Sequence, residues 1–105
     1  MATQECITAM TERIVRDFGP ERVILFGSHA RGDAGADSDV DLLVVLEHVD
    51  DARKVTVAIR RTLTDFAVAK DIIVTTPEEI RRRGHLVGTI LRPALREGKT
   101  LYARQ

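Results

Sequence analysis

Apolar positions repeat with helical spacing at the start of the chain and then give way to a short apolar run. Those between residues 4 and 18 lie mostly three or four positions apart, which predicts an amphipathic helix. They are Cys6, Ile7, Met10, Ile14, Val15 and Phe18. Gly19-Pro20 should end this helix. The next five residues, Arg-Val-Ile-Leu-Phe at 22–26, are rich in β-formers and predict a buried strand.

A second strand is predicted by the alternating sequence Asp-Val-Asp-Leu-Leu-Val-Val-Leu at residues 39–46. Side chains alternate between the two faces of a strand. The residues expected on one face are Val40, Leu42, Val44 and Leu46, and those expected on the other are Asp39, Asp41, Leu43 and Val45. Residues 27–38 are rich in Gly, Ala and Asp and predict a loop, in which a helical turn can start at Ser28.

The central part of the chain predicts a helix followed by a third strand. Asp50-Asp51 offers an N-cap for a helix that should run to about residue 66. Its buried stripe is expected at Val55, Ile59 and Leu63. Residues 68–75 then predict a strand.

The last third of the chain predicts two helices and a short strand. Thr76 is a suitable N-cap for a helix with Pro77 at its first position. A further helix is expected at residues 86–97, with Pro93 as a kink or break and Gly98 as its C-cap. Leu101-Tyr102 is expected to form a short final strand. This order of elements predicts an α+β fold, or α/β sandwich, with a small mixed sheet flanked by helices.

Composition narrows the functional classes. The 105 residues fit one domain, expected to span residues 1–105, and the low aromatic content of 4% requires an aliphatic core. Lys plus Arg equals Asp plus Glu at 16 each, so non-specific nucleic-acid binding is not expected, and the small charge repulsion between molecules is compatible with a homo-oligomer or a protein partner. The single cysteine, Cys6, fits a reducing compartment. With no signal peptide or membrane-spanning run recognised, we expect a cytoplasmic protein that does not bind membranes.

Two carboxylates, Asp39 and Asp41, are expected on one face of the second strand, with Cα atoms about 6.8 Å apart. Their mutual repulsion would be relieved by a divalent cation, and oxygen ligands suit Mg²⁺ or Mn²⁺. Asp71 starts an otherwise apolar strand and would reach the same site if the two strands are neighbours. Three such acids could hold two metal ions about 3.5–4 Å apart, an arrangement used in displacement at phosphorus.

Gly27-Ser28, directly after the first strand, is a candidate phosphate-binding turn. Glycine allows a ligand to approach the backbone, and N–H groups at the start of a helical turn attract anions. An ordinary strand-to-loop turn is the alternative. Arg31 is expected either to contact phosphate or to pair with Asp33 or Asp37, and the sequence leaves both open.

These residues match a known pattern. Gly27-Ser28, ten residues, then Asp39-Val40-Asp41 is the G-S-x10-D-x-D pattern of the DNA polymerase β-like nucleotidyltransferase superfamily. The stretch LFGSHARGDAGADSDVDLLVVL closely resembles the minimal nucleotidyltransferase family. AKDIIVTTPEEI resembles the strand that carries that family's third acid, and LVGTILRPALREGKTLYA resembles its C-terminal helix and tail.

The resemblance implies a polymerase β-like fold and a metal-dependent transfer reaction. Asp39 and Asp41 would bind Mg²⁺, and Asp71 would bind metal and help to deprotonate the acceptor hydroxyl. Gly27 and Ser28 would hold the triphosphate of ATP.

The resemblance also implies a partner. Many minimal nucleotidyltransferases are antitoxins of HEPN-domain toxins, and active members transfer AMP to a toxin tyrosine. The chain has no room for a substrate-binding domain of its own, so we expect another protein to present the acceptor. Two alternatives remain, an antitoxin that blocks its toxin sterically and a small-molecule nucleotidyltransferase that dimerises.

Overall fold

The computed structural model describes residues 3–35, 38–84, 86 and 91–104. In chain order the elements are α1 (Thr3–Phe18), β1 (Arg22–Phe26), α2 (Ser28–Arg31), β2 (Val40–Val45), α3 (Ala52–Thr62), β3 (Lys70–Thr75), α4 (Pro77–Arg83), α5 (Leu91–Glu97) and β4 (Lys99–Ala103).

The strands form a four-stranded sheet in the order β3-β2-β1-β4. β1 is antiparallel to both of its neighbours, whereas β2 and β3 are parallel. The sheet is therefore mixed, and the predicted α+β fold is confirmed. Because β2 and β3 run side by side, their first residues meet at the same end of the sheet.

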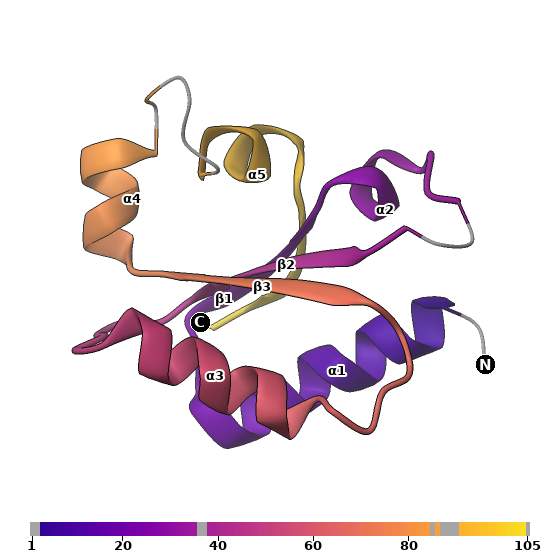
Figure 1. Cartoon of the computed structure of the whole chain (residues 1–105). Coiled ribbons are helices and arrows are strands. Elements are labelled where there is room, and N and C mark those ends of the chain that lie inside the picture. The colour runs from indigo at the N-terminus through magenta and orange to yellow at the C-terminus, as the bar shows by residue number, and fades with distance from the viewer. Residues whose placement is uncertain (1–2, 36–37, 85, 87–90, 105) are drawn as a thin grey trace.

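Helices cover both faces of the sheet. Figure 1 shows α1 and α3 together on one face, with α4 and α5 on the other. The short helix α2 contributes Ala30 to the core on the α1 and α3 side. Val40, Leu42, Val44 and Leu46 belong to the core shared with α1 and α3, as their alternation predicted. Leu43 and Val45 pack on the opposite side in a smaller core with α5. Asp41 has the same strand parity as Leu43, so its carboxylate lies on the face that carries α5.

Most predicted helix boundaries correspond to local capping signals. α1 ends before Gly19, whose φ of 57° is one that L side chains rarely adopt. The Asp51 side chain caps α3 by accepting a hydrogen bond from the Lys54 N–H at 3.2 Å. The Thr76 hydroxyl caps α4 in the same way by accepting from the Glu79 N–H at 3.2 Å.

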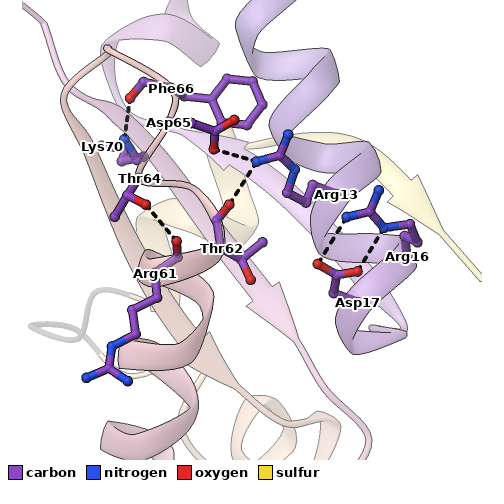
Figure 2. Close-up of polar contacts among 9 residues, drawn as sticks. All are labelled: Arg13, Arg16, Asp17, Arg61, Thr62, Thr64, Asp65, Phe66 and Lys70. Atoms are coloured by element: carbon purple, nitrogen blue, oxygen red, sulfur yellow. Dashed lines mark hydrogen bonds and ion pairs between the residues drawn. The ribbon is translucent and has the colours of Figure 1, made fainter.

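The end of α3 differs from the prediction because of a long-range contact. The helix ends at Thr62, not near residue 66. Arg13 of α1 donates a hydrogen bond to the Thr62 carbonyl at 2.9 Å and pairs with Asp65 (Figure 2). Its guanidinium also lies over the ring of Phe66, 4.7 Å from the centroid. These contacts hold residues 62–66 in a turn against α1, a constraint that helical periodicity does not contain.

The C-terminal elements differ in detail. α5 begins at Leu91, and Leu86 lies outside any helix, whereas residues 87–90 of the predicted helix fall outside the described residues. Pro93 lies in the first turn described for α5, where its missing N–H is tolerated. Gly98 follows α5 without the positive φ of a left-handed cap. A Cβ there would lie 2.5 Å from Cγ2 of Ile24, so close packing explains the glycine.

The bounds of three strands also differ from the predicted ones. β2 is shorter than predicted at both ends, β3 starts two residues later at Lys70, and β4 extends beyond Leu101-Tyr102 on both sides. No helix in the described part of the chain is long and apolar enough to cross a membrane.

Candidate active site

Three strands bring the candidate site together at one end of the sheet. Asp41 is the register partner of Phe26 on β1 and of Asp71 on β3. Neighbouring strands lie about 4.8 Å apart, so Asp71 and the residue that precedes Gly27 both flank Asp41. The predicted proximity of Asp41 and Asp71 therefore follows from the parallel pairing of β2 with β3.

Gly27 contacts the acid directly. A Cβ at this position would lie 2.3 Å from Oδ2 of Asp41, far inside van der Waals contact. The Gly27 backbone also has φ 77° and ψ −156°, a conformation that favours glycine. Packing and backbone geometry thus independently require glycine where β1 turns into α2.

α2 is a single helical turn built on Gly27. The Gly27 carbonyl accepts hydrogen bonds from the N–H groups of Ala30 and Arg31, both at 3.1 Å. Gly32 ends the turn in the left-handed conformation at φ 85°. No described residue accepts a hydrogen bond from the backbone N–H of Ser28 or His29. The start of this turn therefore has donors available beside Asp41.

His29, in the middle of α2, is partly buried. Its Nε2 lies 3.2 Å from the carbonyl oxygen of Ser38. Because Ser38 directly precedes Asp39, this contact ties α2 to the start of β2. No local sequence signal indicates this role, since the two residues are nine positions apart.

Burial raises the pKa of Asp41 above its usual value, and the negative charges of Asp71 and Asp39 raise it further. The positive charges of His29 and Arg31 act in the opposite direction. Arg31 itself pairs with Asp33 at 3.3 Å, one of the two alternatives that the sequence left open; Asp37 lies outside the described residues. The site therefore concentrates more negative charge around Asp41 than the protein compensates.

The other two acids are more exposed. Asp39 lies just before β2 and is exposed to solvent. Asp71 is half exposed, and its Oδ1 accepts a hydrogen bond from Nη2 of Arg60 at 3.0 Å. Arg60 was not among the predicted site residues. The contact requires α3 to pack back along β3, which the sequence does not specify locally.

The donor set fits a hard divalent cation, although the side chains do not converge on one point. Among the described residues, no three Asp, Glu, His or Cys side chains are grouped closely enough to hold a metal ion. The three carboxylates nevertheless lie at one end of the sheet, and no described residue hydrogen-bonds to the side chain of Asp39 or Asp41. Oxygen-only ligands and a partly desolvated carboxylate are compatible with Mg²⁺ or Mn²⁺.

Further titratable residues of the described chain lie away from this site or in the core. Cys6 is buried on α1, as expected for a packing residue. Glu47 follows the far end of β2 and pairs with Arg104 at 3.3 Å. His48 is exposed and contacts Asp50 at 2.8 Å. The exposed arginines at the end of α4 are Arg81, Arg82 and Arg83. His85 lies outside the described residues.

The chain is similar to known nucleotidyltransferase domains. The family model of the nucleotidyltransferase domain matches residues 8–96. No curated protein matches the chain. A Sulfolobus solfataricus protein assigned as a nucleotidyltransferase superposes with a TM-score of 0.68 at 22% identity, over 95% of this chain and 79% of that one.

Two further similar structures are toxin–antitoxin complexes. One was solved with AMP-PNP and superposes with a TM-score of 0.59 at 20% identity, over 93% of this chain and 74% of that chain. The other is a mutant MntA–HpeT complex, with a TM-score of 0.56 at 17% identity and the same coverage of 93% and 74%. At these identities the structures show a shared fold. Because the family match spans α1 to α5, including Gly27 and all three aspartates, this chain belongs to the nucleotidyltransferase domain family.

Proposed function

We propose that this protein is a metal-dependent nucleotidyltransferase that transfers AMP from ATP to a tyrosine hydroxyl of a HEPN-domain toxin and thereby acts as its antitoxin. The observation that carries the proposal is the close approach of the Gly27 backbone to the Asp41 carboxylate. It juxtaposes a turn suited to phosphate with an acid suited to metal, and nucleotide transfer needs both.

The triphosphate would lie at the start of α2. The N–H groups of Ser28 and His29 have no described acceptor, and the Ser28 hydroxyl adds a donor. Arg31 would supply positive charge if it exchanges Asp33 for a phosphate oxygen. Asp39, Asp41 and Asp71 would hold Mg²⁺ or Mn²⁺, which when bound neutralises charge on the phosphates.

The reaction that fits this arrangement is an in-line displacement. The acceptor oxygen forms a bond to the α-phosphorus, while the bond between the α-phosphorus and the α–β bridging oxygen breaks. The bridging oxygen and its electron pair leave with pyrophosphate, and the hydroxyl proton passes to Asp71. The products are an AMP ester of the acceptor and pyrophosphate, so atoms and charge balance.

A partner protein is proposed as the source of the acceptor. Two structures of similar fold are toxin–antitoxin complexes, one of them with an ATP analogue. Asp39 and Asp71 are both accessible to solvent, so a docked protein can reach the acids. We place the reaction in the cytoplasm, where ATP and Mg²⁺ are abundant.

The proposal can be tested with ATP labelled at either end. The partner toxin is incubated with this protein, Mg²⁺ and ATP that carries label at the α- or the γ-phosphorus. Transfer of AMP predicts label on the toxin from α-labelled ATP alone. Label from γ-labelled ATP would indicate phosphoryl transfer instead. Neutralisation of the toxin without label from either would support steric inhibition.

A further inference from the structure

Arg60 contacts the candidate site from the opposite side of the sheet. It belongs to α3, which covers the face away from Asp41, whereas Asp71 lies at the start of the edge strand β3. Nη2 of Arg60 nevertheless reaches Oδ1 of Asp71 at 3.0 Å, and both side chains remain about half exposed, at 48% and 50%. The arginine therefore passes around the β3 edge to meet the acid.

This contact distinguishes Asp71 from the other two acids. Within the described part of the chain, Arg60 is the one residue that hydrogen-bonds or ion-pairs with the side chain of any of Asp39, Asp41 and Asp71. Asp71 thus has a cationic partner at hydrogen-bond distance, whereas no described residue forms such a pair with the carboxylate of Asp39 or Asp41. In this arrangement the three acids do not form a metal-binding group.

Asp71 is well placed to change partners. Its Cα is the register neighbour of the Asp41 Cα on the parallel strand, so the backbone need not move to bring the carboxylates together. Rotation about the side-chain bonds of a half-exposed aspartate between staggered positions is sufficient. The Arg60 side chain, also half exposed, can return to solvent at little cost.

We propose that Arg60 is an internal counter-cation that holds Asp71 in the metal-free protein and must be displaced when the metal ion binds. The inference rests on the metal site of the proposed function. Arg60 and the metal ion are both cations that compete for the one Asp71 carboxylate. The Arg60–Asp71 ion pair thus inhibits metal binding. The metal ion binds most readily when Arg60 has released the Asp71 carboxylate.

The experiment measures the affinity of the full chain for Mn²⁺ by calorimetry, at low salt and without nucleotide. Arg60→Met removes the competing charge and should tighten Mn²⁺ binding about two- to fivefold, the range expected for a half-exposed ion pair. The gain should shrink at high salt, because exposed charges are then screened.

Arg61→Met is the matched control. It removes the same charge from the adjacent residue of α3, and Figure 2 shows the Arg61 side chain extending away from the neighbouring polar contacts. No described residue pairs with its guanidinium. Arg61→Met should therefore leave Mn²⁺ affinity close to that of wild type.

A double-mutant cycle tests whether Arg60 acts through Asp71. In an Asp71→Asn background, Arg60→Met should no longer change Mn²⁺ affinity, because there is no carboxylate to compete for. Unchanged or weaker Mn²⁺ binding by Arg60→Met alone would overturn the inference, as would a gain that persists in the Asp71→Asn background. If Asp39→Asn with Asp41→Asn binds Mn²⁺ as well as wild type, the proposed metal site itself fails. Thermal unfolding of each variant confirms that it is folded.

Discussion

Oδ2 of Asp41 occupies the space next to Gly27, 2.3 Å from where a Cβ would lie. Gly27→Ala should therefore displace the carboxylate as well as strain the backbone. We expect loss of nucleotide transfer and destabilisation of about 1–3 kcal/mol or more, measured by urea unfolding. Gly32→Ala is the matched control, because Gly32 has φ 85° but open space around its Cβ position. It should show the backbone strain alone and retain more activity, and equal losses in both variants would contradict the close-contact account.

Asp41→Asn should abolish transfer without weakening the metal-free fold. The raised pKa of Asp41 means that its charged form is disfavoured in the folded state. A neutral amide of similar shape removes that penalty, so the unfolding midpoint at neutral pH in a chelator should stay equal or rise. Asp39→Asn should also abolish transfer, with less effect on stability because Asp39 is exposed. Full activity of the Asp39→Asn, Asp41→Asn double variant would rule out the proposed metal ligands.

Ser28→Ala should weaken nucleotide use more mildly than loss of an acid. One hydrogen bond to a charged phosphate is worth about 1.5–3 kcal/mol, which corresponds to about a 10–150-fold loss in kcat/KM. The backbone N–H groups of the α2 turn remain in the variant. If kcat/KM from steady-state kinetics is unchanged in Ser28→Ala, Ser28 does not bind phosphate. Arg31 would then be the next residue to test.

The turn after α3 should make folding stability sensitive to acid through Asp65. Hydrogen bonding to Arg13 lowers the pKa of Asp65 below its usual 3.8. The pair therefore contributes stability above the pKa of the unfolded state and loses it as pH falls through the folded pKa. Asp65→Asn should lower the thermal midpoint at pH 7, and the gap to wild type should close as pH falls below about 4. In an Arg13→Met background the effect should be largely lost, and a gap that persists at low pH would contradict this assignment.

Local signals in the sequence were sufficient for most of the fold. The alternation at 40–46 predicted which side chains face each core, and Thr76 with Pro77 predicted the start of α4. Both depend on neighbouring residues. The end of α3 was not predictable, because it is held by Arg13, which lies 49 residues before Thr62.

In the candidate site, too, the residues marked by local sequence signals were predicted, and those fixed by long-range packing were not. The motif spacing placed Gly27, Asp39 and Asp41 together, and the apolar strand after Asp71 indicated a neighbour for β2. His29 and Arg60 were not identified, since the partner of each is fixed by how α2 or α3 packs. Residues that act through a positioned side chain are thus harder to read from sequence than the acids themselves.

Covalent modification of a partner, with Asp71 as the general base, can be detected by intact-mass spectrometry of that partner. After incubation with ATP and Mg²⁺, wild type should add one or more AMP masses. Asp71→Asn should bind the partner equally but transfer about 10²–10⁴-fold more slowly, the usual contribution of general-base assistance. A partner that wild type neutralises without any change in mass would contradict the enzymatic account.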